Sequence, residues 1–155
     1  IGGSIFSFSI KVKEGNQELD SIKKSEIIVS QPKSLKVLIV EDGATNQVIA
    51  KSFLKKLGHT SVIVENGIEA IAKLKEEKFD LILMDCHMPI MDGFEATQEI
   101  IRIYGDSRPR IVALTASVMK ADIKKCYKVG MDDFLPKPLK LSDLSVALKK
   151  NQPVN

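Results

Sequence analysis

The fold is decided by residues 81–93, which read LILMDCHMPIMDG. Four apolar residues follow one another with no polar residue between them, and a single carboxylate, Asp85, ends the run. A strand of this composition is typical of a parallel sheet that helices cover on both faces, because neither side of the strand meets water. Residues 81–84 are therefore predicted to form a buried strand, and the next helix is expected to begin near Gly93.

Four further short runs are predicted to be strands of the same sheet. Two of them, LKVLIV and IVAL, are as apolar as the first, and two, SVIV and DDFL, are weaker candidates. They lie at residues 35–40, 111–114, 61–64 and 132–135. Between the runs, apolar residues recur with helical spacing, as at Ile49, Phe53 and Leu57. A β-α unit repeated five times predicts an α/β domain with a parallel sheet, right-handed crossovers and helices on both faces.

The ends of the helices are also indicated by single residues. Gly58 and Gly130 are expected to end helices, since glycine adopts the left-handed conformation that often follows a last turn. Asn66 and Ser142 are predicted to cap helix starts with their side chains. The helix that ends at Gly130 is expected to contain Met119, Ile123 and Cys126.

Polar residues follow the strands at the points where the strands end. Ligand sites in open α/β sheets lie at the carboxyl ends of the strands, so these side chains are expected to meet in one crevice. The residues are Glu41 and Asp42 after the first strand, Asp85 after the third, Thr115 after the fourth and Lys137 after the fifth.

The chemistry of this group of residues indicates a metal and a phosphoryl group. Carboxylates that meet raise one another's pKa unless a cation lies among them, and oxygen ligands with room for water suit Mg²⁺. A lone carboxylate such as Asp85, beside the metal, can act as a nucleophile toward phosphorus. Lys137 and the metal would neutralise the transferred oxygens, and Thr115 would donate a hydrogen bond to them.

Each of these residues also has an ordinary structural explanation. Carboxylates after strands are often helix caps, a lone Thr or Lys at a strand end is usually structural or solvated, and the Lys137-Pro138 pair fits a turn. His87 fits a loop, and Cys86 a small buried side chain. The joint occurrence in the right order on four strands favours the functional interpretation.

Composition and charge exclude several classes. The chain has 155 residues and 23 basic against 20 acidic side chains, a net charge of +3. Because neither sign is clustered, no nucleic-acid partner and no direct membrane contact are predicted. Cys86 and Cys126 are far apart in sequence, so a reduced, cytoplasmic protein is expected. The chain begins at Ile1 with no signal peptide, which indicates a fragment of a longer protein.

Four segments together resemble the receiver domains of response regulators. They read LKVLIVEDGATNQVIA, LILMDCHMPIMDGFEA, IVALTA and GMDDFLPKPL, and the resemblance covers residues 35–150. It implies a flavodoxin-like, doubly wound sheet of five parallel strands in the order 2-1-3-4-5. It also implies a domain that promotes its own phosphorylation and dephosphorylation with Mg²⁺ or Mn²⁺.

The resemblance assigns roles position by position. It makes Asp85 the phosphoacceptor, Asp42 a direct metal ligand and Glu41 a ligand that usually acts through water. It makes the backbone carbonyl of His87 a metal ligand and Lys137 the lysine that precedes a cis-proline, Pro138. It makes Thr115 the switch hydroxyl and Phe134 the aromatic side chain that turns inward on phosphorylation. Gly43 departs from the family, in which Asn or Asp often follows the acidic pair, and is expected to loosen that loop without removing the metal. His87 and Ser117 occupy positions that tune the lifetime of the acyl phosphate.

The residues that flank this domain indicate its context. Residues 1–12, IGGSIFSFSIKV, resemble the closing strand of a histidine-kinase ATP-binding domain, residues 13–34 are a predicted linker, and 151–155 a tail. The parent would be a hybrid histidine kinase, whether or not a membrane anchors it. The implied partners are a histidine kinase domain, which donates the phosphoryl group, and a histidine-containing phosphotransfer protein.

Three other functions fit the sequence less well than a phosphorelay module does. A docking module that works without phosphorylation would not need the complete set of Asp42, Asp85, Thr115 and Lys137. A haloacid-dehalogenase-type phosphatase needs a second Asp two residues after the nucleophile, where this chain has His87. A flavodoxin must cradle phosphate in its first loop, where acidic residues repel it.

Overall fold

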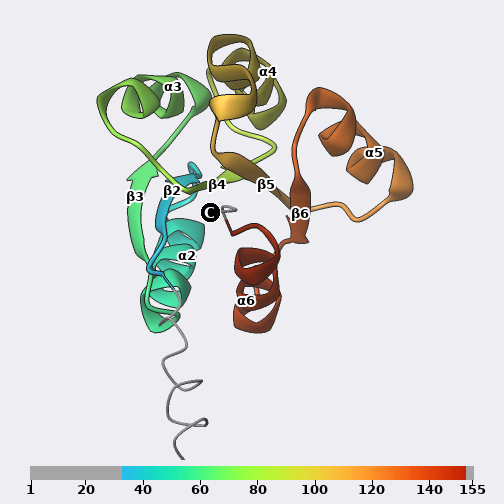
Figure 1. The fold of residues 1–155 in the computed structure, drawn as a ribbon. Helices are drawn as coiled ribbons and strands as arrows, with labels where there is room; N and C mark the ends of the chain where they lie inside the picture. The colour runs from blue at the N-terminus through green and yellow to red at the C-terminus, as the bar shows by residue number, and fades with distance from the viewer. Residues whose placement is uncertain (1–32, 153–155) are drawn as a thin grey trace, which may run out of the picture. The chain divides into compact units, whose positions relative to one another are not determined.

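Five parallel strands form one sheet in the computed structural model, which describes residues 33–152 (Figure 1). The strands are β2 (Lys36–Val40), β3 (Thr60–Val64), β4 (Leu81–Asp85), β5 (Arg110–Thr115) and β6 (Asp133–Pro136). Their order across the sheet is β3-β2-β4-β5-β6, with every neighbouring pair parallel. Counted from the first of these strands, this is the order 2-1-3-4-5, so the predicted fold is confirmed.

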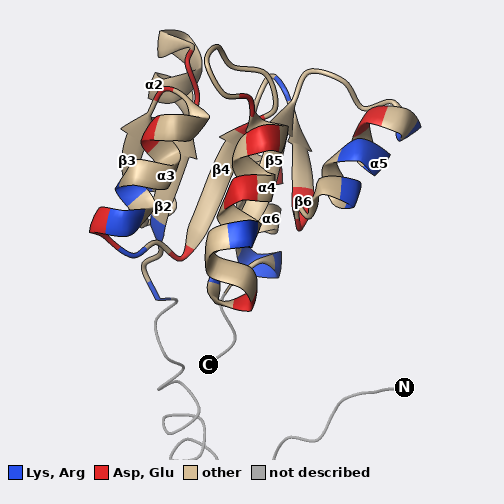
Figure 2. Ribbon diagram, turned by 90° about the horizontal axis from the view of Figure 1, so that it is seen from above, with Lys and Arg blue, Asp and Glu red and all other residues tan. Residues whose placement is uncertain are grey.

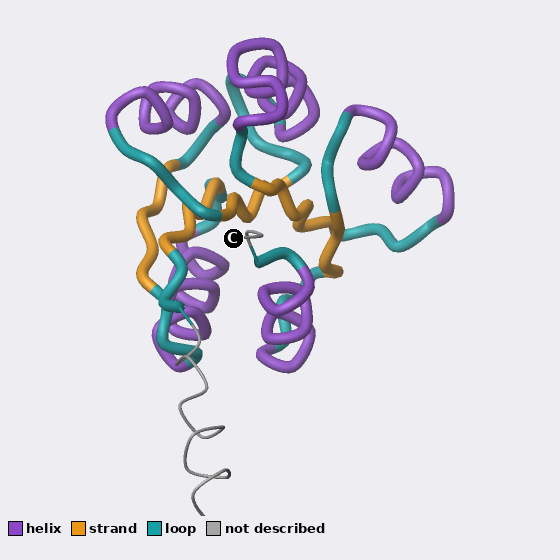
Figure 3. Tube along the Cα trace, in the orientation of Figure 1, coloured by secondary structure: helices purple, strands orange, loops and turns teal. Residues whose placement is uncertain are grey.

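Helices cover both faces of this sheet. They are α2 (Ala44–Lys56), α3 (Gly67–Glu76), α4 (Gly93–Tyr104), α5 (Lys120–Val129) and α6 (Leu141–Lys150), with a short 3-10 turn, η2 (Gly105–Ser107). Figures 1 and 3 show α2 and α6 on one face and α3, α4 and α5 on the other, and Figure 2 shows basic and acidic residues together on each of α3, α4 and α5. Within these helices, no segment combines the length and apolar character needed to cross a bilayer.

Two apolar cores, one on each face, explain the uninterrupted apolar runs. Leu38 and Ile82 point toward the core under α3, α4 and α5, whereas Val37 and Leu81 point toward the core under α2 and α6. Successive side chains of a strand alternate between faces, so a strand buried on both sides shows no polar alternation. Cys86 lies in the first core together with Cys126, and both side chains are buried.

Several of the predicted helix ends are confirmed. The Asn66 side chain accepts a hydrogen bond of 3.0 Å from the Glu69 backbone N–H at the start of α3. Gly58 and Gly130 follow α2 and α5 with φ values of 84° and 106°, which side-chain-bearing residues adopt at a cost.

Two expectations about helix ends are wrong. Met119 was expected within α5 but precedes it and is largely exposed, because it occupies the capping position at the end of a loop. Ser142 does not cap α6, because that helix already begins at Leu141 and Lys140 is the capping residue. A polar residue close to a helix start is therefore not sufficient to locate the cap.

The predictions for the flanking segments fall mostly outside the described residues. The expected strand at residues 1–12 and all but the last two residues of the 13–34 linker lie there, as do residues 153–155. Asn151, at the start of the predicted tail, is fully buried and donates to Asp133 Oδ2 at 3.0 Å and to the Ala147 carbonyl at 2.8 Å.

An ion pair ties the loop before β6 to the start of β5. The Asp132 carboxylate accepts two hydrogen bonds from the Arg108 guanidinium, at 2.7 and 3.1 Å, and a third of 2.7 Å from the Ile111 backbone N–H. Burial would raise the pKa of Asp132, but these bonds outweigh it and hold the pKa below its usual range. The charged form therefore stabilises the folded state.

We expect Asp132→Asn to lower the free energy of unfolding by about 2–3 kcal/mol at neutral pH, the scale of charge-assisted hydrogen bonds. Because the pKa is lowered on folding, the stabilisation is present above the ordinary carboxyl pKa and is lost as the pH falls through the lowered value. The difference from wild type should therefore shrink in acid. Urea unfolding at several pH values measures this, with the exposed Asp106→Asn as control. Equal stability of the two variants at neutral pH would refute the prediction.

Candidate functional site

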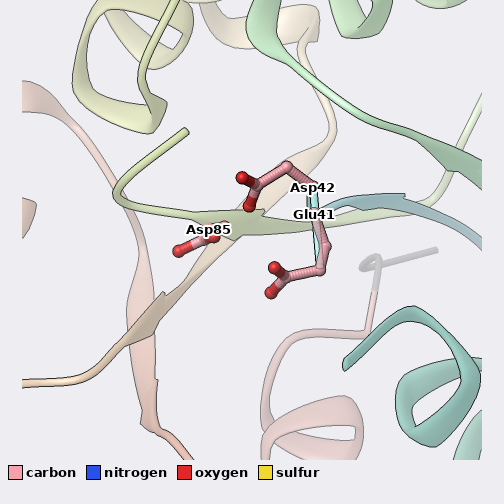
Figure 4. Close-up of side chains that lie close together, drawn as sticks. All are labelled: Glu41, Asp42 and Asp85. Carbon is pink, nitrogen blue, oxygen red and sulfur yellow. The ribbon is translucent and has the colours of Figure 1, made fainter. Parts of the chain in front are cut away.

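Three carboxylates meet at the carboxyl edge of the sheet. Glu41 and Asp42 follow β2 directly, and Asp85 is the last residue of β4, which pairs with β2. One ligand oxygen of each residue lies within 4.8 Å of the others. Figure 4 shows the three side chains around one space beside the end of β4. Glu41 and Asp85 are buried, whereas Asp42 is exposed, so the cluster opens toward solvent through Asp42.

Lys137 supplies a positive charge to this cluster. Its Nζ lies 2.9 Å from Glu41 Oε2 and 3.0 Å from Asp85 Oδ1, so one ammonium bridges two buried carboxylates. The loop that carries it is tied to β5, because the Lys137 backbone N–H donates to the Thr115 carbonyl at 2.7 Å. The peptide bond between Lys137 and Pro138 is cis.

The pKa values of the site follow from burial and from these contacts. Burial raises the pKa of Asp85, and the charge of Glu41 adds to this, so the pKa stays above its ordinary value despite the hydrogen bond from Lys137. Burial also acts on Glu41, but hydrogen bonds from Lys137 and from the Gly43 N–H outweigh it and lower the pKa. Burial opposes the charge of Lys137, yet its two carboxylate partners hold the pKa of the ammonium above its usual range.

Hydrogen bonds hold the loop after β2 in place although it contains Gly43. The Gly43 N–H donates to Glu41 Oε1 at 3.0 Å, and the Gln47 side chain donates to the Glu41 carbonyl at 2.7 Å. A Cβ at Gly43 would lie 3.2 Å from both Glu41 Oε1 and Asn46 Nδ2. Gln47 and Asn46 were not singled out from the sequence, because polar residues in a first helical turn are too common to indicate a site.

A glycine also shapes the loop after β4. The Gly93 N–H donates to the Cys86 carbonyl at 3.1 Å, and a Cβ at Gly93 would lie 2.1 Å from the Asp85 carbonyl oxygen. Only glycine permits this approach. In the same loop, the His87 N–H donates to Asp85 Oδ1 at 3.2 Å, while the exposed His87 ring packs edge-on against Phe94.

Thr115 and Phe134 belong to β5 and β6, which lie on the opposite side of β4 from β2. Thr115 ends β5, the strand paired with β4, and its hydroxyl donates to the Ser117 carbonyl at 2.9 Å. Phe134 lies in β6, half-buried, with its ring edge-on to Tyr127 at 6.4 Å between centroids. The tertiary structure thus places the predicted site residues at the carboxyl ends of β2, β4 and β5, in the loops that follow β4 and β6, and, for Phe134, within β6.

The donor set fits a hard divalent cation. Three carboxylates and one ammonium leave two negative charges without a partner among the described residues of the cluster. All the side-chain donors are oxygens, and the exposed side of the cluster leaves room for water, which Mg²⁺ retains when it binds to proteins. Asp42 and Asp85, with Glu41 behind them, are the residues that could hold such an ion.

Solved structures share this fold. The receiver domain of sensor histidine kinase PA1611 from Pseudomonas aeruginosa, with a magnesium ion coordinated in its active site cleft, is 36% identical. The match covers 77% of this chain and 98% of that chain, with a TM-score of 0.70. The Saccharomyces cerevisiae co-crystal structure of the phosphotransfer protein Ypd1 with the Ssk1 receiver domain matches at 35% identity and a TM-score of 0.72, over 77% of this chain and 89% of that one.

Curated relatives are hybrid kinases and histidine kinases. Hybrid signal transduction histidine kinase B of Dictyostelium discoideum is 41% identical over 142 residues, which cover 84% of this chain. Histidine kinase 5 of Arabidopsis thaliana is 35% identical over 155 residues and 83% of this chain. The chain spans only 7% and 17% of the lengths of these two proteins.

The fold and the site together define a class of protein: a doubly wound α/β domain with an acidic site at the carboxyl ends of its strands. The response regulator receiver domain model matches residues 37–149, and the chain belongs to this family. Hybrid histidine kinases carry receiver domains of this family. Receiver domains act in two-component phosphorelays.

Proposed function

We propose that Asp85 accepts a phosphoryl group from a phosphohistidine of a kinase or phosphotransfer protein. A carboxylate oxygen of Asp85 forms a bond to phosphorus while the bond to the donor's imidazole nitrogen breaks, and the electron pair of that bond stays on the imidazole. The observation that carries the proposal is the position of Asp85, at the end of β4, 3.0 Å from Lys137 Nζ and beside two further carboxylates.

The other residues of the site would stabilise the transferred oxygens. Lys137 neutralises charge on the phosphoryl group, and Thr115 donates a hydrogen bond once its hydroxyl turns toward Asp85. Asp42 and Asp85, with the His87 carbonyl and with Glu41 acting through water, would hold Mg²⁺ or Mn²⁺. The bound ion would supply charge neutralisation of the phosphoryl oxygens. Phe134 would turn inward as Thr115 moves, which changes the surface of α5, β6 and α6.

We infer the context of the whole protein from its relatives. A hybrid histidine kinase would donate to this domain, and a histidine-containing phosphotransfer protein would receive the phosphoryl group from it, in the cytoplasm. The likeness to hybrid kinases and to a receiver solved with Ypd1 supports this assignment.

Incubation with acetyl phosphate, followed by intact mass spectrometry, tests the proposal. One added phosphoryl group is expected with Mg²⁺, and only background labelling without it. Absence of labelling under both conditions would favour a docking module that works without phosphorylation.

An apolar collar around the site fits a protein donor. Four of the eight exposed large hydrophobic side chains found in residues 33–152 lie near the start of α2 or in the loops after β4 and β5, at the edge that carries Asp85. These are Val48, Ile90, Val118 and Met119, each more than half exposed. In the proposed complex these side chains would supply the apolar part of the surface that contacts the donor.

We expect Val48→Glu to slow transfer from phosphorylated Ypd1 about tenfold, because a charge in the collar must be desolvated on docking. Labelling by acetyl phosphate should not change, since a small donor needs no protein contact. Val146→Glu, at an equally exposed position on α6, is the control. Equal transfer rates for the two variants would argue against the collar as a docking surface.

A further inference from the structure

The Thr115 hydroxyl is held by the loop that follows it. Its single proton is donated to the Ser117 carbonyl at 2.9 Å, and its oxygen accepts from the Ser117 N–H at 3.1 Å. Both functions of the hydroxyl are therefore engaged with one residue. To donate to a phosphoryl group on Asp85, Thr115 must first break its bond to the Ser117 carbonyl.

Ser117 is itself anchored to α5. Its hydroxyl donates to Asp122 Oδ2 and lies 3.4 Å from the Met119 N–H, which donates to it. Asp122 is the third residue of α5, and its backbone N–H donates to the Met119 carbonyl at 3.0 Å. The half-buried carboxylate thus connects the first turn of the helix to the loop that holds Thr115.

A hydrogen bond to a carboxylate is stronger than one between neutral groups. The bond from Ser117 to Asp122 therefore stabilises the loop conformation in which the Thr115 hydroxyl faces Ser117. Any movement of Thr115 toward Asp85 that displaces Ser117 has to weaken this bond. The free-energy difference between the two positions of Thr115 would then depend on a residue that touches neither the metal ligands nor the phosphoryl group.

We propose that Asp122 is a positioning residue that acts through Ser117 to hold the Thr115 hydroxyl in its resting orientation. This inference rests on the proposed function, because the orientation matters only if Asp85 accepts a phosphoryl group. Loss of the Asp122 carboxylate should make the active orientation easier to reach. The phosphoryl mimic beryllofluoride, which binds to the active orientation, should then bind more tightly, not more weakly.

Asp122 has a second, purely structural role that the test must separate. A carboxylate in the first turn of a helix interacts favourably with the helix dipole, and its loss weakens the helix. Asp143 is the matched control, since it is the third residue of α6, is also half-buried and follows a capping residue without a side-chain cap bond. Among the described residues, no hydrogen bond involves its carboxylate.

The experiment compares Asp122→Ala with Asp143→Ala in the complete chain. Beryllofluoride is titrated at saturating Mg²⁺, and binding is followed by the amide chemical shifts of residues 115–140. Asp122→Ala should raise the affinity about fivefold or more, the scale of coupling between linked sites. Asp143→Ala should bind like the parent. Ser117→Ala should also raise the affinity for beryllofluoride, which keeps the test decisive if Asp122→Ala folds poorly.

A second comparison assigns the effect to Thr115. In a Thr115→Ala background, Asp122→Ala should change the affinity little, because there is no hydroxyl left to release. An unchanged or weakened affinity in both Asp122→Ala and Ser117→Ala, or an effect that persists without Thr115, would overturn the inference. Failure of the parent and of Asp143→Ala to bind beryllofluoride would instead overturn the proposed function.

Discussion

Asp85→Asn should leave a folded protein that acetyl phosphate no longer labels. The amide has no charged oxygen to attack phosphorus, so the rate should fall on the order of 10⁴-fold or more, the scale on which loss of a nucleophile acts. Intact mass after timed incubation with acetyl phosphate and Mg²⁺ measures the rate.

The stability of this variant provides an internal check. The pKa of Asp85 is raised mainly by burial, so its charged form is disfavoured in the folded state, and a neutral side chain of the same shape should not destabilise the protein without metal. Asp106→Asn, an exposed site outside the cluster, should be labelled like the parent. Normal labelling of Asp85→Asn would place the phosphoacceptor elsewhere.

Asp42→Ala should weaken Mg²⁺ binding at least about tenfold, since even residues that only support metal ligands are worth that much. Asp42 is the exposed member of the cluster, where an ion would meet both protein and solvent. Without Asp42, the two remaining carboxylates, Glu41 and Asp85, and the Lys137 ammonium give the cluster a net charge of only −1. The attraction for a divalent ion then falls sharply. Isothermal titration calorimetry with Mg²⁺ gives the two affinities directly.

The control for this measurement is another strand-end carboxylate. Glu65 follows β3 as Glu41 follows β2, but it is exposed and is not one of the three residues of the cluster. Glu65→Ala should therefore bind Mg²⁺ like the parent. Equal affinities for Asp42→Ala and the parent would mean that Asp42 is not a ligand, whereas a loss in Glu65→Ala would indicate a general charge effect.

The sequence by itself determined the architecture, because that information is local. A strand or helix that buries one or both faces has apolar residues at a characteristic spacing in the sequence. The apolar run at 81–84 and the helical spacing of Phe53 and Leu57 are examples. The edge on which the site lies followed as well. In a parallel sheet every strand ends at the same edge, so Glu41, Asp85 and Lys137 were expected to meet before any distance was known.

The tertiary structure alone decided which of these residues touch and which are buried. Glu41 and Asp42 are adjacent in sequence, yet one is buried against Lys137 and the other is exposed. Gly93 approaches the Asp85 carbonyl, and Ser117 is bound to Asp122, through loop conformations that no periodicity encodes. Loop geometry is set by packing between elements distant in sequence, and a single sequence contains no local signal for such distances. The same reason accounts for Met119, whose spacing from Ile123 indicated a place in the helix although it lies in the loop before α5 and is exposed.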